Sequence, residues 1–438
     1  MFGTDGVRGT PGHEPLDAAT VVSLGAAMAA ELGNFPRIVC GRDTRDSGVW
    51  LEQHFAAGVS SEGGTVISAG VMPTPGVSLI TGSKDFDAGV VISASHNPHP
   101  DNGIKLLQAN GEKSSREFEN RIEARVRRSA NVVRELPNKP VSMADFGDLY
   151  TDHLIQIVGD VDLSGMSIAI DCGHGATSGI APLVMNKLGV SCVKIHAEPN
   201  GHNINQESGS THPETLQQAV VDGCCQLGFG FDGDGDRVIL VDSRGEIVDG
   251  DGVLFVAARH LQGSSRLRSN GIVATVMSNF GLEVALAESG IQVHRCQVGD
   301  WHVREEMQKR SVCLGGEQSG HIIFSDWLPT GDGLATALLM MCMVAQSGQA
   351  LHELLTDFSI FPQTLLNVSV KKKRDLATVP EFMTVVHKAE QQLDGHGRVL
   401  VRYSGTESLL RIMVEGPDQD MVDQLAANIA ACAQERLV

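Results

Sequence analysis

Three carboxylates stand at alternate positions in residues 231–237, which read Phe-Asp-Gly-Asp-Gly-Asp-Arg. They are Asp232, Asp234 and Asp236, and the glycines between them let the backbone turn tightly around one point. Carboxylates this close repel one another, so a bound cation is the arrangement that best keeps them ionised. Because every ligand atom is an oxygen, the segment predicts a site for Mg²⁺ or Ca²⁺ rather than zinc.

Two other interpretations of this acidic segment fit less well. A calcium loop of the EF-hand type needs glycine at its sixth position and glutamate at its twelfth. This chain has Arg237 and Ser243 there. A solvated acidic turn is the other alternative, but the apolar residues 227–231 read as a buried strand that leads into the loop. The metal site is therefore the favoured interpretation.

A second segment places a serine where α/β sheets usually bind ligands. Residues 90–94 predict a strand; Ser95 and His96 follow it, and Pro98 ends regular structure. No G-x-S-x-G turn surrounds Ser95, so an acyl-transfer nucleophile is not indicated. A phosphorylated serine fits better, because its oxygens could complete a metal shell of three aspartates. The alternative is a serine that only caps its own turn.

The strands and helices that must position these residues alternate in three similar stretches. Each stretch ends in a strand and a special loop, at Ser95, Asp232 and Glu317, which predicts three related domains directing equivalent loops at one cleft. The expected strands lie near 37–40, 65–68, 88–94, 167–170, 192–195, 227–231, 272–277, 291–296 and 312–315, and the expected helices near 16–32, 49–61, 180–188, 213–224, 282–289 and 301–309.

The tail differs, and its pattern predicts a small α+β domain. The expected fold class is α/β: three similar α/β domains with mixed sheets around a central cleft plus a smaller α+β C-terminal domain. The basic run 371–374 is interpreted as a solvated strand end. The expected tail elements are strands 366–370, 398–402 and 410–414 with helices 379–393 and 421–436; the expected domains are 1–145, 146–250, 251–364 and 365–438, with linkers at 134–141 and 243–252.

Length, charge and cysteine usage limit the classes of protein. A chain of 438 residues is too long for one core. A net charge of −19, from 53 acidic and 34 basic residues, argues against nonspecific binding of nucleic acid or anionic membranes. The longest apolar run, 334–345, is too short to span a bilayer. Nine scattered cysteines and a start directly on motif residues, without a signal peptide, predict a cytoplasmic location.

Five segments, in family order, resemble the α-D-phosphohexomutases. They are 2–9, 93–105, 232–237, 316–321 and 402–407, and the resemblance runs from residue 2 to about 416. The Gly-Thr-Asp-Gly-Val-Arg-Gly start and the segment Gly-Glu-Gln-Ser-Gly-His resemble the glucosamine-phosphate branch of that family. The resemblance implies an intramolecular phosphotransferase of the isomerase class. It would interconvert glucosamine 6-phosphate and glucosamine 1-phosphate through a phosphoserine and a bisphosphorylated sugar, supplying amino-sugar nucleotide and cell-wall precursors.

The resemblance also implies roles for single residues. Ser95 would carry the phosphoryl group and hold Mg²⁺ with the three aspartates. Lys105 and His321 are the proton-transfer candidates, and Arg8 and His96 would line the cleft. The residues implied in substrate binding are Arg237, Glu317 and Ser319 and, at the phosphate that does not react, Arg402, Ser404, Gly405, Thr406 and Arg411. The implied small-molecule partners are a hexosamine phosphate and a bisphosphate sugar activator; a homodimer is left open.

Three substitutions depart from the family pattern, at Trp301, at Tyr403 and at Ser408, where proline is usual. Trp301 replaces a frequent arginine, which removes a cation near the expected cleft, and Tyr403 stands where proline or another residue is usual. The departures leave two alternatives: a phosphomannomutase or phosphoglucomutase, or a relative that binds sugar phosphates without turnover. Retention of Ser95, Lys105 and the three aspartates argues against the second alternative.

Overall fold

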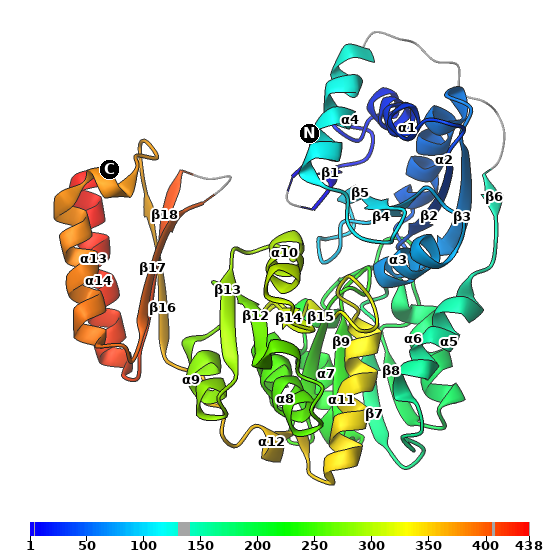
Figure 1. Cartoon of the computed structure of the whole chain (residues 1–438). Helices are drawn as coiled ribbons and strands as arrows, with labels where there is room; N and C mark the ends of the chain where they lie inside the picture. Colours follow the sequence, from blue (N-terminus) through cyan, green and yellow to red (C-terminus); the bar gives the residue numbers. More distant parts are fainter. Residues whose placement is uncertain (4, 130–140, 405–407, 438) are drawn as a thin grey trace. The chain divides into compact units, whose positions relative to one another are not determined.

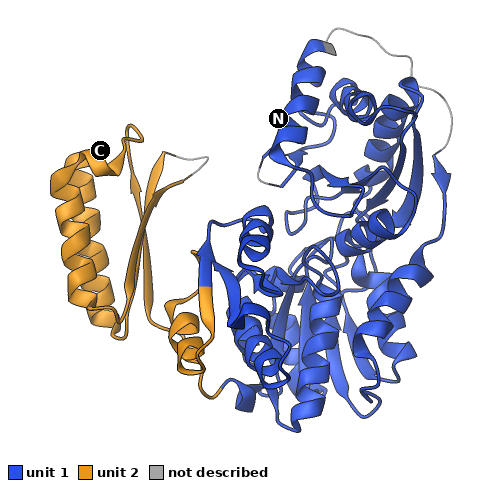
Figure 2. Cartoon of the chain, in the orientation of Figure 1, with its two compact units in different colours: residues 1–275, 294–355 blue, residues 276–293, 356–438 orange. Residues whose placement is uncertain are grey.

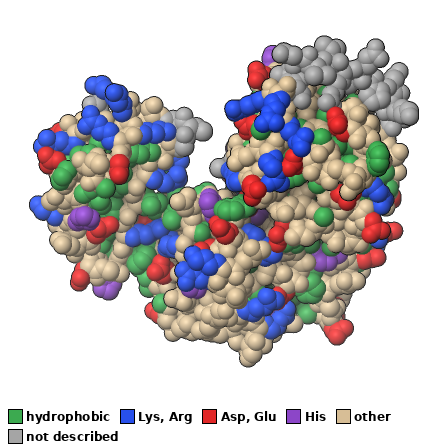
Figure 3. All heavy atoms as spheres, turned by 45° about the horizontal axis from the view of Figure 1, so that its top comes forward, with side chains coloured by type: hydrophobic (Ala, Val, Ile, Leu, Met, Phe, Trp, Pro, Cys, Tyr) green, Lys and Arg blue, Asp and Glu red, His purple; other side chains and the backbone are tan. Residues whose placement is uncertain are grey.

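The computed structural model describes residues 1–3, 5–129, 141–404 and 408–437. The chain divides into two compact units: residues 1–275 with 294–355, and residues 276–293 with 356–438 (Figure 2). None of the helices in the described ranges is long and apolar enough to cross a membrane. Basic and acidic side chains are interspersed on the face drawn in Figure 3, so the net charge of −19 does not make that face uniformly acidic.

The first stretch of unit 1 forms a six-stranded sheet (Figure 1). Its strands are β1 (Val7–Gly9), β2 (Arg37–Arg42), β3 (Thr65–Val71), β4 (Ala88–Ile92), β5 (Asn102–Gln108) and β6 (Ser142–Met143), and its helices are α1 (Ala18–Leu32), α2 (Ser47–Ser61), α3 (Thr74–Ser83) and α4 (Arg116–Ser129). The strand order is β1-β5-β4-β2-β3-β6. Every residue of β4 is buried, as expected for a central strand covered on both faces.

The second and third stretches repeat this plan. The second has strands β7 (Ser167–Asp171), β8 (Ser191–Ile195), β9 (Leu227–Phe231), β10 (Val238–Asp242) and β11 (Ile247–Val248), with helices α5 (Gly147–Val158), α6 (Thr177–Lys187) and α7 (Glu214–Asp222). The third has strands β12 (Gly271–Thr275), β13 (Gln292–Cys296), β14 (Leu314–Gly316) and β15 (Ile322–Phe324), with helices α8 (Gly250–Gly263), α9 (Phe280–Glu288), α10 (Asp300–Arg310), α11 (Gly333–Ser347) and α12 (Leu351–Leu354). Of these, α9 and the first two residues of β13 belong to unit 2.

The three sheets share one strand order. It reads β5-β4-β2-β3 in the first, β10-β9-β7-β8 in the second and β15-β14-β12-β13 in the third. In each sheet an antiparallel strand pairs with the last parallel strand. The loops that join these pairs carry Ser95, Asp232 and Glu317. The repetition and the α/β fold class expected from the sequence are therefore confirmed.

Unit 2 contains the smaller α+β fold expected for the tail. Its sheet is antiparallel in the order β16-β18-β17, from β16 (Gln363–Ser369), β17 (Arg398–Tyr403) and β18 (Leu409–Glu415). Helices α13 (Pro380–Leu393) and α14 (Gln419–Leu437) bury their apolar sides in one core with β18, which includes Phe382, Ile412 and Ile429. Such a shared core is what lets a two-layer domain of this size fold.

Of the two expected linkers, one contains regular structure, and the other lies mostly outside the described residues. Residues 243–252, expected as a linker, contain β11, which pairs with β10, and the start of α8. Asp249 caps that helix by accepting from the backbone N–H groups of Asp251 and Gly252. Of the linker expected at 134–141, all but the last residue lies outside the described residues.

Candidate active site

Loops from all three sheets of unit 1 line one cleft of about 370 Å³ together with the amino-terminal segment. The lining residues are Met1, Gly3, Asp5, Gly6, Arg8, His96, Asp236, Arg237, Val298, Gly299, Asp300, Glu317 and His321. Six of them were singled out in the sequence. A larger cavity of about 500 Å³, between α5, α8 and α11, contains none of the predicted site residues, so cavity size alone does not mark the site.

Ser95 is fully buried, and its hydroxyl points at the acidic loop. Its Oγ donates to Oδ2 of Asp232 at 2.6 Å. The backbone of Ser95 has φ +54°, a left-handed conformation that costs a non-glycine residue free energy. Hydrogen bonds hold this conformation: the backbone N–H donates to Ser93 Oγ, and the carbonyl accepts from Arg45 and Asn205. The fold thus fixes the Ser95 hydroxyl beside the carboxylates.

The three aspartates form a compact, buried group of oxygen donors. Ligand atoms of Asp232, Asp234 and Asp236 all lie within 4.8 Å of one another. Thr74 Oγ1 donates to Asp234 Oδ2 at 2.5 Å, which fixes that carboxylate. Among the described residues, Oδ1 of Asp234 and Oδ1 of Asp236 have no hydrogen-bond partner. Buried carboxylate oxygens normally have partners, and a cation satisfies such atoms, so the group fits a metal-binding site.

Lys105 supplies positive charge to this acidic group. Its Nζ lies 2.8 Å from Asp234 Oδ2, 3.1 Å from Asp5 Oδ2 and 3.6 Å from Asp236 Oδ2. Burial alone lowers the pKa of Lys105, but the three carboxylates outweigh it and raise the pKa well above its usual range. Proton transfer near neutral pH needs the opposite direction, so the role of Lys105 in proton transfer stays a prediction.

The aspartates themselves have opposite pKa shifts. Burial, together with the charges of Asp236 and Asp234, raises the pKa of Asp232 well above its ordinary value. Burial also acts to raise the pKa of Asp236, yet Lys105, His321 and Arg237 lower it. The group therefore carries more negative charge than its protein surroundings fully balance, which favours a bound cation.

His321 is buried between Asp236 and a backbone amide. Its Nδ1 lies 3.6 Å from Asp236 Oδ2, and the Gly331 N–H donates to Nε2 at 3.2 Å. Against the effect of burial, Asp236 raises the pKa of His321 to about 9, whereas the Gly331 N–H favours a neutral ring with its proton on Nδ1. His321 is thus placed to hold a proton at Nδ1.

His96 and two arginines border the other side of the serine. Burial, with Arg237 and Arg8 nearby, lowers the pKa of His96 to about 4. The Arg237 guanidinium lies 3.3 Å from His96 Nδ1, and Arg8 donates to Asn97 Oδ1 at 3.1 Å. A neutral His96 between two cations suits a site that must accept phosphate oxygens.

Glu317 is positioned by backbone groups of the third loop. Its side chain is 8% exposed, and Oε1 accepts from the Gly299 N–H at 3.0 Å. The hairpin closes through Gly320, whose N–H donates to the Glu317 carbonyl and whose φ of +90° favours glycine. Ser319, the other predicted sugar contact, is exposed and does not belong to the cleft lining.

Sequence reasoning missed three residues that join the loops. Lys113 Nζ lies 2.8 Å from Asp5 Oδ1 and 2.9 Å from Asp300 Oδ1. This ion-pair bridge links the amino-terminal loop to the segment before α10. Asp5 lies in the segment 2–9 that carries the family resemblance, and Asp300 is next to Trp301, so these positions offered a signal, whereas nothing local marks Lys113.

The phosphate loop predicted in the tail lies in unit 2. Arg402 on β17 and Arg411 on β18 are direct cross-strand partners. Ser404 is buried, and its carbonyl accepts from Lys373 Nζ at 2.6 Å. Residues 371–374 follow the end of β16 and are all exposed, as predicted for the basic run, although Lys373 also makes this one hydrogen bond. Gly405 and Thr406 lie outside the described residues.

Comparison with known proteins decides the family. Models of the four phosphoglucomutase/phosphomannomutase domains match most of the chain in order: domain I at residues 1–132, domain II at 148–245, domain III at 249–360 and the C-terminal domain at 365–431. This chain belongs to the phosphoglucomutase/phosphomannomutase family. It is accordingly a phosphohexomutase, an intramolecular phosphotransferase of the isomerase class.

Curated relatives of this phosphohexomutase are phosphoglucosamine mutases. The protein from Solibacter usitatus is 45% identical over 98% of this chain and 97% of its own length, and that from Deinococcus deserti is 44% identical over 99% and 98%. A solved phosphoglucomutase/phosphomannomutase family protein from Burkholderia thailandensis has the same fold, with a TM-score of 0.81 at 22% identity over 99% of this chain and 98% of that one.

Trp301 is the substitution that was expected to remove a cation near the cleft. It is the second residue of α10, and its N–H donates to Asp300 Oδ1 at 2.7 Å. One turn later, Arg304 pairs with Glu112 at 2.7 Å. The tryptophan therefore leaves the Asp300–Lys113 ion pair in place.

Proposed function

We propose that this enzyme interconverts glucosamine 6-phosphate and glucosamine 1-phosphate. The observation that carries the proposal is the 2.6 Å hydrogen bond from Ser95 Oγ to Asp232 within the buried aspartate group. A hydroxyl fixed there can carry a phosphoryl group beside a metal site. The choice of sugar rests on the 42–45% identity to curated phosphoglucosamine mutases.

Mg²⁺ is the proposed cation, held by Asp232, Asp234, Asp236 and Ser95. Among the described residues, the Oδ1 atoms of Asp234 and Asp236 accept no hydrogen bond, and these atoms and the all-oxygen donor set fit a hard divalent cation. When bound, the cation would supply positive charge to the oxygens of the transferring phosphoryl group. Thr74 and Lys105 hold the Asp234 carboxylate in position for it.

The proposed reaction moves a phosphoryl group twice. The O1 hydroxyl of glucosamine 6-phosphate attacks phosphorus on phosphorylated Ser95; the P–O bond to Oγ breaks as the bond to O1 forms, and the hydroxyl proton passes to a base. The bisphosphorylated sugar then reorients in the cleft, so that its O6 phosphate faces Ser95. Ser95 Oγ takes the phosphoryl group from O6, and O6 regains a proton. Lys105 and His321 are the proposed carriers of these protons.

The remaining predicted residues would orient the sugar phosphate. Glu317 and Ser319 would meet the sugar hydroxyls, while Arg8, His96 and Arg237 would contact the transferring phosphate. In unit 2, we assign binding of a phosphate group to Arg402, Ser404 and Arg411, together with Gly405 and Thr406. The cross-strand pairing of two arginines supports this, because an anion between them relieves their repulsion.

The remaining proposals concern organisation and setting. The domain limits 1–145, 146–250, 251–364 and 365–438 are retained as proposals. A bisphosphate sugar is the proposed activator, since it would restore the phosphoserine. A cytoplasmic location is supported by nine cysteines that are all free. The product would serve amino-sugar nucleotide and cell-wall precursor synthesis.

The test combines mass and turnover. Intact mass before and after phosphatase should show one removable phosphate, and Ser95→Ala should lose both that phosphate and turnover. Loss of one hydrogen bond to Asp232 should cost only about 1 kcal/mol of stability, so the variant should fold. The matched control is Ser60→Ala, at an exposed position of α2.

Two outcomes bear on different parts of the proposal. Unchanged turnover in Ser95→Ala would remove Ser95 from the mechanism. Wild-type enzyme assayed side by side with glucosamine, glucose and mannose phosphates should prefer glucosamine 6-phosphate. A preference for mannose 1-phosphate would overturn the named substrate and leave the mutase chemistry standing.

A further inference from the structure

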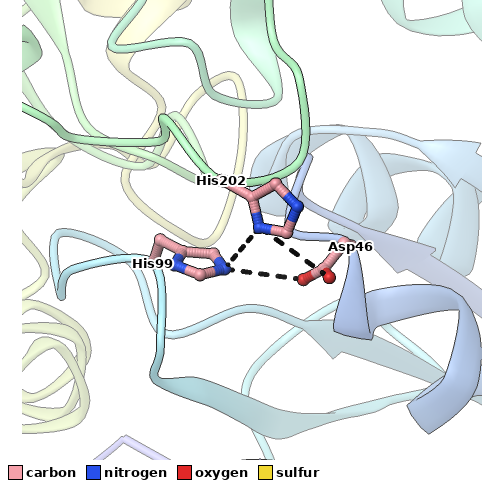
Figure 4. A group of neighbouring side chains, drawn as sticks. All are labelled: Asp46, His99 and His202. Atoms are coloured by element: carbon pink, nitrogen blue, oxygen red, sulfur yellow. Dashed lines mark hydrogen bonds and ion pairs between the residues drawn. The ribbon is translucent and has the colours of Figure 1, made fainter.

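Three side chains outside the cleft converge on one point of unit 1. They are Asp46 at the start of α2, His99 in the β4–β5 loop and His202 in the segment after β8. Figure 4 shows the three side chains directed toward one another from three separate segments of chain. Their ligand atoms all lie within 4.8 Å of one another, so the group could hold one ion.

The spacing of these atoms suits a tetrahedral ion. His202 Nδ1 lies 2.9 Å from His99 Nε2, His99 Nε2 lies 3.7 Å from Asp46 Oδ1, and His202 Nδ1 lies 3.9 Å from Asp46 Oδ2. Ligand bonds of 2.0–2.1 Å at tetrahedral angles place neighbouring ligand atoms about 3.3 Å apart. The observed separations bracket that value, so small side-chain rotations would suffice to bind the ion.

The backbone beneath the group is held in place. The Asp46 N–H donates to the Gly201 carbonyl at 3.1 Å, which ties the start of α2 to the segment that carries His202. Gly201 has φ +91°, and a Cβ there would lie 3.1 Å from the Asp46 Cβ. This close approach sets the distance between Asp46 and His202 before any ion binds, which lowers the entropic cost of binding.

The exposure of the group leaves room for a further ligand. The side chains are 54% exposed for Asp46, 31% for His99 and 62% for His202. Two imidazoles and a carboxylate open to solvent provide three protein ligands and leave the fourth position to water. Imidazole nitrogen favours zinc-class ions, whereas Mg²⁺ prefers oxygen donors.

We propose that Asp46, His99 and His202 form a second metal site, for a divalent transition-metal ion of the zinc class. It differs from the aspartate group in its nitrogen ligands and in its exposure. The proposal does not depend on the sugar or on the phosphoryl transfer proposed above.

Occupation of this site would restrain the Ser95 loop. Arg45, next to Asp46, donates to the carbonyls of Ser95 and Pro98. Asn205, three residues after His202, also donates to the Ser95 carbonyl, and His99 belongs to the same loop as Ser95. An ion that joins Asp46, His99 and His202 therefore clamps the three segments that already hold the serine.

The test is a Zn²⁺ titration of the full chain with Mg²⁺ in large excess, so that the aspartate group is occupied. Bound zinc is counted with a competing chromophoric chelator. Wild type should bind one more Zn²⁺ than His99→Gln or His202→Gln, or bind that ion at least about tenfold more tightly. The control His212→Gln changes an exposed histidine outside the group and should match wild type.

A second readout separates loss of ligands from loss of fold. Without zinc, all variants should have melting temperatures close to that of wild type, because His202 and His212 are exposed and His99 is only partly buried. With zinc, the melting temperature should rise in wild type and His212→Gln and should rise less in His99→Gln and His202→Gln. Cysteines that bind zinc would do so equally in every variant. Equal stoichiometry and affinity in all four proteins would overturn the site.

Discussion

Arg402 and Arg411 face each other as direct partners across β17 and β18. Two like charges opposite one another destabilise an antiparallel pair. Burial and the neighbouring Arg411 charge both lower the pKa of Arg402, which reflects the same repulsion. A bound phosphate dianion would remove the repulsion between the two arginines, and the relief of this repulsion would strengthen binding. Guanidinium groups also bind phosphate through paired hydrogen bonds.

Arg402→Ala and Arg411→Ala should therefore raise KM for every hexose phosphate by a similar factor. Loss of a charged phosphate contact costs roughly 1.5–3 kcal/mol, or about ten- to hundredfold. Steady-state kinetics with three sugar phosphates measure this, with Arg436→Ala on the exposed side of α14 as control. An arginine variant that loses only one of the sugars would show that these residues do not form a common phosphate anchor.

Substitutions of Thr74 test the metal site without changing any of the proposed metal ligands. Its Oγ1 donates to Asp234 Oδ2 at 2.5 Å from the start of α3. Thr74→Val removes the donor but keeps the shape, and should weaken Mg²⁺ activation by about ten- to hundredfold. Thr74→Ser keeps the hydroxyl and should therefore show the same Mg²⁺ activation as wild type. The concentration of Mg²⁺ giving half-maximal rate is the measurement.

The same titration examines the cation itself. A chelator should abolish turnover of wild type, and Ca²⁺ should bind yet support little turnover, because its looser shell positions oxygens poorly. Full activity of metal-free protein would contradict the assignment of the aspartate group.

The sequence located most strands and the three special loops because those features are local. Strand β9, for example, is an apolar run with turn residues at its end, and it was placed at 227–231 as observed. Helix α11 was not assigned as a helix because it is buried nearly all round and shows no amphipathic stripe. Strand β5 was missed because it carries the polar Asn102 and Lys105, whose burial only the assembled sheet explains.

The sequence predicted which residues belong to the site, but it did not predict most of the contacts between them. Ser95 and Asp232 were paired through the family resemblance, and they are hydrogen-bonded. Thr74 and Lys105 meet Asp234 across 160 and 129 residues of sequence, and no local pattern encodes such contacts. The electrostatic state of Lys105 depends on these neighbours, which is why its pKa direction could not be read from its motif.

The carboxyl group of Asp332, which lies outside the cleft lining, should make the stability of the protein depend on pH. It caps α11, accepts from Tyr150 Oη at 3.0 Å and is buried. Burial raises its pKa from 3.8 to about 6. Because the folded value lies above the unfolded one, this carboxyl contributes full stability below about pH 4 and loses that contribution as pH rises through about 6.

Asp332→Asn cannot ionise and should escape this loss. Its stability relative to wild type should improve by up to about 3 kcal/mol between about pH 4 and pH 8, from a shift of roughly two units at 1.36 kcal/mol each. Melting temperatures across that range measure the change, with the exposed Asp85→Asn as control. A constant difference between Asp332→Asn and wild type at all pH values would contradict the raised pKa.

Glu317 separates recognition of the sugar from recognition of phosphate. Its Oε1 accepts from the Gly299 N–H, a bond that the amide oxygen of glutamine can keep, so Glu317→Gln should leave the loop in place. What changes is the charge presented to the sugar. The ratio of kcat/KM between glucosamine, glucose and mannose phosphates should change, because discrimination between the three sugars depends on contacts that differ in their transition states.

The comparison with Arg402→Ala makes that test specific. The arginine variant should lower kcat/KM for all three sugars together, while Glu317→Gln should change their ratio. Loss of a charge-assisted contact, worth roughly 1.5–3 kcal/mol, predicts a change of about ten- to hundredfold in that ratio. If Glu317→Gln instead lowers all three values equally, Glu317 contacts a group common to the three sugars, and the amino group must be recognised by another residue of the cleft.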